Sequence, residues 1–477
     1  MWDTLRFVAT AVRQKLVGRG RPEHIQALQQ RRLRRLIAWA KAHSPFHAER
    51  LRGVDPDRFE LRRLPIMTKA EMMEHFDRLL TDRSLKREEL EAFISDPGRL
   101  GQFYRDRYVI TRTSGTQGVP ALIVQDRRMI ELLFALQMTR GTVFPSWAGA
   151  VAVRLLRPVR MASVTIGKGF YPSAVGLAYT PPGARRFMDQ LWLTQIEPLG
   201  EVVEQLNRYQ PQVLLAYANV LELLAREALA GRLQLPALRQ VNNVSEPLSQ
   251  GARRLIRRAF GLPVTDSYAC GECMALSLGC PQGHGMHLQT DWAILEVVDR
   301  EYRPVPPGQP GDRVLITNLY NTLQPFIRYE LPDTVTLSPT PCPCGAPFPL
   351  ILKVEGRSDE VLWIRDHGRY RQVHPYVFVD VLDDYPPIGW YQIIQEERNR
   401  FLLRASPAPG RSLSRDELGA ILEKGLRRFG LHDLVEFAIE ITDRLGPDPR
   451  SGKLKRITSR VGPPHPLGHP APVPAVA

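Results

Sequence analysis

The strongest constraint on the fold is an alternation of β-prone and helical runs over residues 150–264. The β-prone runs 213–216 and 241–244 are each followed by a helical run, 220–230 and 250–260 respectively. Strands that alternate with helices pair in parallel, because each parallel connection has to cross the sheet and a helix makes that crossing. This region is therefore predicted to be α/β with a mainly parallel sheet.

The flanking regions have different patterns, which predict two domains and a tail. Residues 1–82 are predicted to be helical, and residues 286–337 to form strands joined by turns, with strands at 287–298, 313–319 and 334–337. Residues 1–358 are expected to form a large N-terminal domain and residues 359–460 a small α+β C-terminal domain. In the small domain we expect strands at 360–364, 390–395 and 435–442 and a helix at 415–429. The Pro- and Ala-rich tail, 461–477, is expected to be disordered.

Charge and hydropathy exclude several classes of protein. The chain has 477 residues and a formal net charge of +14. No stretch approaches the roughly 20 consecutive apolar residues of a membrane-spanning helix. The first 20 residues lack the apolar block of a signal peptide, so a soluble, cytoplasmic protein is expected. Neither GxxxxGK[ST] nor GxGxxG occurs, which excludes the common phosphate and dinucleotide loops.

The positive charge is concentrated near the N-terminus. Residues 1–63 contain 15 Lys and Arg against 6 Asp and Glu. Arg31, Arg32, Arg34 and Arg35 flank an apolar stripe at helical spacing, which predicts a helix with a solvated basic face. Weak contact of this basic segment with an acidic partner or a membrane surface stays open. Nucleic acid is not an expected partner, because aromatic residues do not interleave with the basic ones.

Residues 113–120 are predicted to form a loop directly after a β-prone run. The loop sequence is Thr-Ser-Gly-Thr-Gln-Gly-Val-Pro, in which hydroxyl and glycine residues dominate. Backbone N–H groups and hydroxyls of such a loop can surround a polyphosphate. On its own, however, the same pattern is typical of ordinary surface loops.

The cysteines indicate a metal site rather than disulfides. Five cysteines in a chain of this length are too few for a disulfide framework. Cys280 and His287, followed by Cys342 and Cys344, offer the four ligands of a tetrahedral, structural zinc site. His284 is the alternative to His287, and a set of reduced, unligated thiols is the alternative to the whole site.

Taken in order, six motifs resemble those of the adenylate-forming (acyl-activating) superfamily, and above all its phenylacetate–CoA ligase branch. Residues 113–120 resemble the [ST]SGTTGxP phosphate loop, 242–247 the SEP segment, 268–272 the YGxxE motif, 327–333 the IRYRTGD motif, 356–359 the GRxD hinge and 452–456 the GKxxR motif. The resemblance spans about residues 30–460. It implies a large adenylate-forming domain followed by a small mobile domain.

The resemblance implies a site for ATP. In this family the aromatic residue of YGxxE packs on the adenine, which points to Tyr268, and the last Asp of IRYRTGD binds the ribose, which points to Asp333. The implied nucleotide-binding residues are Thr113, Ser114, Gly115, Thr116, Gln117, Gly118, Ser245, Glu246, Pro247, Tyr268, Arg328 and Asp333.

Three further roles follow from the resemblance. Glu272 would bind Mg²⁺, Lys453 would contact the substrate carboxylate and the α-phosphate, and Asp359 would be the hinge between the domains. Cys270 and Cys273 lie on either side of Glu272 with C-x-x-C spacing. Ordinary small residues are favoured there over a metal or redox role.

The implied reaction is that of an acid–thiol ligase. A carboxylic acid, expected to be aromatic or aryl-acetic, would be activated by ATP to an acyl-adenylate. The acyl group would then pass to CoA, a carrier-protein thiol or an amine. Residues 217–219 lie where this branch places its acyl contacts, although Tyr217 is as readily a core residue as a ligand contact.

Several positions depart from the family pattern. Gln117 replaces a Thr, Ala121 replaces a Lys, and Leu331 and Pro332 replace Thr-Gly before Asp333. Pro332 lacks a backbone donor. Residues 366–370 lack the family's GVNVFPxxIE segment, which leaves the acceptor open. The alternative function is therefore a degenerate, non-catalytic nucleotide-binding or scaffold member of the same fold.

Overall fold

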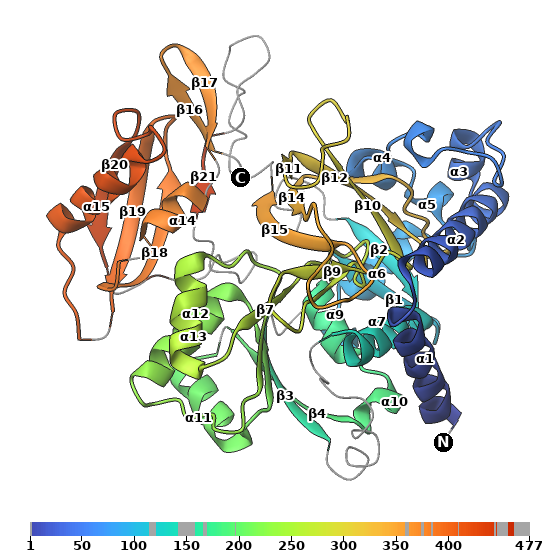
Figure 1. Cartoon of the computed structure of the whole chain (residues 1–477), viewed down its shortest axis with the longest axis horizontal. Helices are drawn as coiled ribbons and strands as arrows, with labels where there is room; N and C mark the ends of the chain where they lie inside the picture. The colour runs from blue at the N-terminus through green and yellow to red at the C-terminus, as the bar shows by residue number, and fades with distance from the viewer. Residues whose placement is uncertain are drawn as a thin grey trace. The chain divides into compact units, whose positions relative to one another are not determined.

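The computed structural model describes residues 2–113, 121–141, 158–165, 169–195, 197–357, 362–373, 376–382, 385–408, 410–442, 445 and 457–461. The chain divides into two compact units, whose elements are labelled in Figure 1. The large unit comprises Met1–Pro247 and Ile256–Val354, and the small unit comprises Leu248–Leu255 and Glu355–Ala477. No helix in the described part of the chain has both the length and the apolar run needed to cross a bilayer.

The N-terminal part of the large unit is helical, as the sequence predicts. Its helices are α1 (Trp2–Gly18), α2 (Pro22–His43), α3 (Pro45–Arg50), α4 (Lys69–Glu74), α5 (Phe76–Leu79) and α6 (Arg87–Ile94), with 3₁₀ turns at Leu61–Arg63 and Pro97–Arg99. Proline opens both α2 and α3, and the Ser44 side chain caps α3 by accepting from the His47 backbone N–H at 3.3 Å.

The basic face predicted on α2 is only partly solvated. Arg31, Arg34 and Arg35 are exposed. The side chain of Arg32, in contrast, is only 11% exposed and pairs with the buried Asp291 at 3.2 Å. The prediction is therefore wrong for Arg32, because a buried carboxylate distant in the sequence takes this guanidinium out of solvent.

A parallel sheet of five strands forms the α/β part of the large unit. Its order is β4 (Met188–Thr194), β3 (Val159–Thr165), β5 (Val213–Ala216), β6 (Gln240–Val244) and β7 (Val264–Ser267), and every neighbouring pair is parallel. The connecting helices include α9 (Pro172–Ala178), α10 (Pro182–Arg185), α11 (Leu199–Tyr209), α12 (Ala218–Leu229) and α13 (Gln250–Phe260). The α/β prediction is thus confirmed for this region.

The other sheets of the large unit contain the remaining strands. β1 (Tyr108–Arg112) pairs antiparallel with β2 (Leu122–Asp126), which leads into α7 (Arg127–Thr139). A three-stranded sheet contains β10 (Ala293–Val298), β12 (Arg313–Asn318) and β13 (Tyr329–Leu331). A five-stranded sheet has the order β11 (Pro310–Gly311), β14 (Asp333–Leu337), β15 (Leu350–Arg357), β9 (Met286–Leu288) and β8 (Ser277–Gly279).

The single strand expected near 287–298 is two strands, β9 and β10. The chain turns between them, with the Trp292 N–H donating to the Gln289 carbonyl at 2.8 Å. Asp291, which is fully buried in this turn, binds Arg32 and Arg140. A buried ion-pair network therefore interrupts what the local sequence predicts to be one strand.

The small unit is α+β. Its four-stranded sheet has the order β20 (Glu436–Ile441), β19 (Arg400–Pro407), β18 (Ile388–Gln395) and β21 (Ile457–Ser459). A separate hairpin joins β16 (Leu362–Asp366) to β17 (Arg369–Val373), and the helices are α14 (Tyr376–Leu382) and α15 (Arg415–Arg427). Leu418, Leu422 and Leu426 of α15 pack into the same apolar core as the strands.

Candidate nucleotide site and metal centre

The carboxyl ends of three neighbouring parallel strands bring the first predicted site residues together. Tyr217 follows β5, Ser245 follows β6 and Tyr268 follows β7. Ligands of open α/β sheets bind at this edge, because the loops that leave the strand ends gather there. Tyr217 is 1% exposed and its hydroxyl lies 2.7 Å from Ser173 Oγ, so its polar end is already satisfied within the protein.

The segment after β6 approaches the start of α12. The backbone N–H of Asn219 donates to Glu246 Oε2 at 3.2 Å, and the Asn243 side chain donates to the Glu246 carbonyl at 2.7 Å. A carboxylate is favourable at a helix N-terminus, where the backbone N–H groups carry partial positive charge. Ser245 is exposed and has a φ of +63°, which turns the chain sharply between β6 and Glu246.

Tyr268 and Asp333 are in direct contact. The Tyr268 hydroxyl donates to Asp333 Oδ2 at 2.6 Å. Burial, followed by the nearby charge of Asp333, raises the pKa of Tyr268 well above its ordinary value, so the phenol remains the donor. Asp333 is the first residue of β14, and Pro332 lies between β13 and β14, where its missing N–H interrupts the strand pairing. The two residues predicted to contact adenine and ribose are therefore neighbours.

The base of the predicted phosphate loop lies against the same segment. Thr113 and Ala121 extend the β1–β2 pairing by two bonds of 2.9 Å, one of them from the Ala121 N–H to Thr113 Oγ1. Gly271 packs beside this base, since a Cβ there would lie 3.2 Å from Ile123 Cδ1 and 3.7 Å from Thr113 Cγ2. The side chain of Gln125 donates to the Gly271 carbonyl at 3.3 Å. The absence of a side chain at Gly271 thus permits this close approach.

Glu272 is a buried carboxylate beside the Tyr268–Asp333 pair. It is 3% exposed, and its backbone carbonyl accepts from the Asn318 side chain at 2.6 Å. Within the described residues, its carboxylate has no hydrogen-bond or ion-pair partner. Its charge contributes to raising the pKa values of both Tyr268 and Cys270. A buried carboxylate without a partner favours binding of a cation. No local motif identifies Asn318, which holds this segment from a strand 46 residues later.

The guanidinium group of Arg328 is already bound by other groups of the protein. Its guanidinium binds Glu296 at 3.0 and 3.2 Å and donates to the backbone carbonyls of Arg62 and Leu64, at 2.8 and 2.5 Å. The side chain is 6% exposed and joins the N-terminal segment to β10. These contacts favour a structural role over the nucleotide contact implied by the motif, because they occupy most of its donors.

The remaining predicted residues lie outside the described residues. These are Ser114, Gly115, Thr116, Gln117 and Gly118 of the loop, the hinge Asp359, Lys453 and nearly all of the tail. Pro247 is described and exposed, directly after Glu246.

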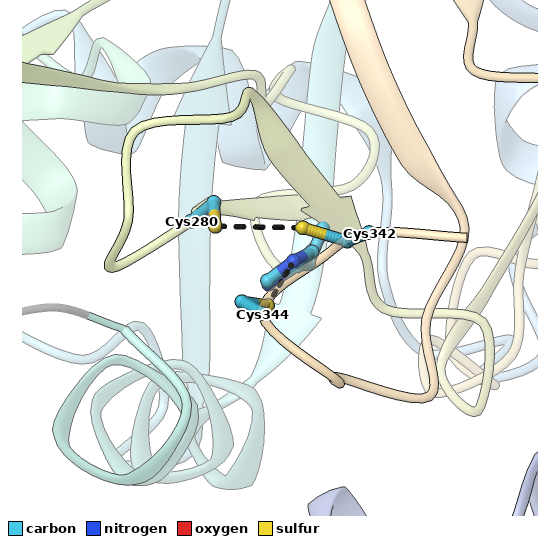
Figure 2. Close-up of side chains that lie close together, drawn as sticks. Cys280, Cys342 and Cys344 are labelled. Atoms are coloured by element: carbon cyan, nitrogen blue, oxygen red, sulfur yellow. Dashed lines mark hydrogen bonds between the residues drawn. The ribbon is translucent and has the colours of Figure 1, made fainter. Parts of the chain in front are cut away.

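The four predicted zinc ligands lie close together beside the five-stranded sheet. They are Cys280, His287, Cys342 and Cys344. Their ligand atoms all lie within 4.8 Å of one another. The sulfurs of Cys280 and Cys342 are 3.6 Å apart (Figure 2), and Cys344 Sγ is 3.3 Å from His287 Nε2. Two thiolates on one tetrahedral zinc ion lie about 3.8 Å apart when each Zn–S bond is about 2.3 Å. The spacing of the four side chains therefore fits zinc.

The fold brings these ligands together from two segments. Cys280 follows β8, His287 lies in β9, and the other two cysteines lie between β14 and β15. Gly285 permits the tight β8–β9 turn, because it has a φ of +139° and a Cβ there would lie 2.4 Å from the Ile351 carbonyl oxygen. The rival ligand His284 is exposed, and its ring contacts Gln282 at 3.2 Å instead.

Cys270 and Cys273 do not belong to the metal-ligand cluster found among the described residues, which is Cys280, His287, Cys342 and Cys344. Burial raises the pKa of the Cys273 thiol to about 12 and that of Cys270 well above its ordinary value. Both thiols are therefore protonated near neutral pH, which suits packed structural residues.

The chain is similar in sequence to known proteins over most of its length. A scan against protein-family models finds no match. The chain is 26% identical over 367 residues to a phenylacetate–coenzyme A ligase of Thermus thermophilus, covering 73% of this chain and 74% of that protein. It is also 26% identical over 366 residues to a phenylacetate–coenzyme A ligase of Escherichia coli, covering 72% of this chain and 73% of that protein.

The fold matches that of a solved ligase. The structure aligns with 2-hydroxyisobutyryl-CoA ligase, in the postadenylation state in complex with 2-HIB-AMP, with a TM-score of 0.68 and 19% identity, covering 91% of this chain and 89% of that chain. Together with the two relatives, this match confirms the resemblance seen in the sequence. The chain is thus distantly similar to the phenylacetate–coenzyme A ligases over nearly three quarters of its length, and it has the fold of a solved adenylate-forming ligase.

Proposed function

We propose that this chain activates a carboxylic acid with ATP as an acyl-adenylate and transfers the acyl group to the thiol of CoA. The observation that carries the proposal is the convergence around residues 268–272. Tyr268 binds Asp333, Gly271 packs against the base of the loop that begins at Thr113, and the next residue, Glu272, is a buried carboxylate whose charge acts on Tyr268. Several of the residues that the proposal assigns to the nucleotide are thus neighbours within the large unit, which supports the proposal.

The first half-reaction is a displacement at phosphorus. A carboxylate oxygen attacks the α-phosphorus of ATP, the bond to the bridging oxygen of the β-phosphate breaks, and pyrophosphate leaves. Asp333 would accept hydrogen bonds from the ribose hydroxyls, with its orientation fixed by the Tyr268 hydroxyl. The loop 113–118 would donate backbone N–H groups to the phosphates. Such fixed positioning is most of what a phosphoryl or nucleotidyl transfer needs from the protein.

Glu272 is the proposed ligand of Mg²⁺. Its low exposure, together with the absence of a partner for its carboxylate among the described residues, fits a cation ligand. When bound, the ion would neutralise phosphate charge. Asn318 fixes the backbone at Glu272 and so holds the carboxylate in place.

Lys453 and Asp359 complete the proposal. The ammonium group of Lys453 would stabilise the negative charge shared by the attacking carboxylate and the α-phosphate. Asp359 would be the hinge at which the small unit moves between the half-reactions. In the second half-reaction the CoA sulfur attacks the acyl carbonyl, AMP leaves, and the thiol proton passes to solvent.

The substrate and the acceptor are proposed from the relatives. The phenylacetate–coenzyme A ligases support an aromatic or aryl-acetic acid, and 2-hydroxyisobutyryl-CoA ligase, also solved with CoA, supports CoA as the acceptor. A carrier-protein thiol or an amine is the alternative acceptor, because the segment 366–370 departs from the family pattern.

The test is ATP–pyrophosphate exchange with a panel of aryl-acetic, aromatic, hydroxy and fatty acids. We expect exchange that depends on both the acid and Mg²⁺, with aryl-acetic acids most active. Mass spectrometry of the products with and without CoA identifies the acceptor. Folded protein that binds Mg·ATP but exchanges with no acid would instead support a degenerate nucleotide-binding member.

The four-residue cluster is proposed to hold one structural zinc ion. Burial raises the pKa of the Cys342 thiol, so a cation is needed to favour the thiolate there. We expect about one zinc per chain by elemental analysis. His287→Ala should lose that zinc and lower the melting temperature, whereas His284→Ala, the matched exposed control, should keep both. Equal zinc content in the two variants would contradict this assignment.

A further inference from the structure

The β16–β17 hairpin of the small unit has one apolar face and one polar face. Leu362, Ile364 and Val373 are buried in the core of the unit. Residues that are paired across two strands point to the same side of the hairpin. Arg365 pairs with Tyr370 in the register, so both lie on the opposite side from that core.

A second arginine reaches the same tyrosine from another element. The guanidinium carbons of Arg398 and Arg365 lie 5.2 Å and 5.9 Å from the centre of the Tyr370 ring. Arg398 belongs to the turn between β18 and β19. We call Arg365, Tyr370 and Arg398 the arginine pair site.

The backbone around the arginine pair site is held firmly. The Asn399 side chain accepts from the Arg365 N–H and donates to the Arg365 carbonyl, each at 2.8 Å. The Gln395 side chain donates to the carbonyls of Trp363 and Arg398, at 2.9 and 3.0 Å. The hairpin and the turn are therefore fixed to each other, which sets the spacing of the two guanidinium groups.

Neither guanidinium has an acidic partner within the described residues. Nearby carboxylates are engaged elsewhere: Asp366 pairs with Arg371 and Glu396 with Arg460, each at 3.3 Å, and Glu397 pairs with Arg400 at 3.2 Å. Nη1 of Arg398 is buried and has no hydrogen-bond partner in the part of the chain that the structure describes. Two guanidinium groups that share the Tyr370 ring, one of them with a buried donor that lacks an acceptor among the described residues, favour the binding of an anion.

The pKa of Arg398 agrees with this electrostatic arrangement. Burial lowers it, and the positive charge of Arg365 lowers it further, while Tyr370 opposes the shift. A bound anion would offset both effects. A phosphate monoester is the best match, because its two negative charges balance two guanidinium groups and its oxygens accept from both forks of donors.

We propose that the arginine pair site binds a phosphate monoester and that this group is the 3′-phosphate of CoA. The assignment to CoA rests on the proposed function, in which CoA is the acceptor. Trp363, half-buried two residues before Arg365 on the same strand face, provides an aromatic surface beside the site.

The test compares CoA with dephospho-CoA, which lacks only the 3′-phosphate. We expect the wild-type chain to have a KM for CoA at least about tenfold below that for dephospho-CoA. Arg365→Ala and Arg398→Ala should each raise the KM for CoA about tenfold and leave the KM for dephospho-CoA within about twofold. Arg369→Ala, which removes the same charge from the exposed tip of the hairpin, is the matched control and should keep the preference. Equal use of both thiols by the wild-type chain would overturn the proposal.

Two parallel measurements separate this inference from the proposed function. ATP–pyrophosphate exchange reports the first half-reaction without CoA. Calorimetric titration with adenosine 3′,5′-bisphosphate reports phosphate binding without turnover. If the chain transfers no acyl group to CoA but binds the bisphosphate about tenfold more tightly than the Arg365→Ala/Arg398→Ala variant does, the phosphate site stands and only its assignment to CoA fails. Equal binding of the bisphosphate by the wild-type and double-variant chains refutes the site itself.

Discussion

Burial determines the protonation state of several side chains, and the effect on stability is clearest for His47. It is 1% exposed, and its Nε2 lies 2.9 Å from the Pro325 carbonyl oxygen. Burial lowers the pKa of His47 from 6.5 to about 4, with a further contribution from the positive charge of Arg50, while the bond to Pro325 opposes the shift. The imidazole is therefore neutral in the folded chain at neutral pH.

This pKa predicts an acid-sensitive contribution to stability. The unfolded chain binds more protons than the folded chain between pH 6.5 and about 4, so the contribution of neutral His47 is complete above pH 6.5 and is lost as the pH falls. Between pH 7 and pH 5 the loss is about 2 kcal/mol. We expect His47→Gln, which keeps an amide donor for Pro325, to lack this part of the pH dependence. Urea unfolding of both proteins at the two pH values measures it, and parallel pH profiles would contradict the prediction.

At the nucleotide site, Asp333 offers the sharpest substitution. Its carboxylate accepts from Tyr268 at 2.6 Å and is proposed to accept from the ribose as well. Asp333→Asn replaces one of the two acceptor oxygens by a donor. We expect the KM for ATP in the exchange assay to rise about tenfold or more. The KM for the acid should change by less than about threefold, and equal changes in both constants would argue for general misfolding.

The residues of the proposed nucleotide site could be selected from the sequence, but their contacts could not. Tyr268, Glu272 and Asp333 stand in recognisable motifs, and the structure brings them together. The motif around Arg328 gives no sign that Glu296 and two backbone carbonyls occupy its guanidinium. Such contacts depend on segments far away in the sequence, which local spacing does not report.

At the scale of elements, a buried ion network joins the N-terminal helices to the strands. Asp291, between β9 and β10, binds Arg140 at the end of α7 and Arg32 of α2. Arg140 also donates to Gln14 of α1 at 3.1 Å. The side chains of Arg140 and Asp291 are 4% and 0% exposed, so both charges depend on this pairing.

Removing the shared carboxylate should destabilise the large unit strongly. Asp291→Ala leaves two poorly exposed guanidinium groups without their partner, and we expect a loss of about 3–5 kcal/mol in the free energy of unfolding. Arg303→Ala is the control, because its guanidinium pairs with Asp299 and Glu301 but is 71% exposed, and should cost less than about 1 kcal/mol. Chemical denaturation compares the two, and similar costs would show that the network contributes little.

Elements with a clear periodic pattern could be predicted from the sequence, whereas others depend on distant partners. The runs over 213–260 fold as β5, α12, β6 and α13 within one or two residues of their predicted ends. β19 and the hairpin strand β17 are not predicted, because arginines at 400 and 404 and at 369 and 371 interrupt their apolar pattern. Pairing with β18 and β16, respectively, defines these strands.

At the scale of the whole molecule, the proposed reaction needs groups from both units. Thr113, Tyr268 and Asp333 belong to the large unit, whereas Lys453 belongs to the small one. The predicted boundary after residue 358 and the hinge at Asp359 lie outside the described residues and stay predictions. Adenylation would therefore depend on the small unit, although most of the nucleotide contacts proposed here come from the large one.

Lys453 tests this dependence, because Lys455 provides a control in the same basic run. If Lys453 stabilises the charge shared by the carboxylate and the α-phosphate, Lys453→Ala should lower ATP–pyrophosphate exchange about 100-fold or more. Lys455→Ala should lower it less than about threefold. Supplied with preformed acyl-adenylate, the Lys453→Ala chain should still form the thioester, since that step breaks the acyl C–O bond and makes or breaks no bond to phosphorus. Equal loss of exchange in both variants would mean that the run acts only through its net charge.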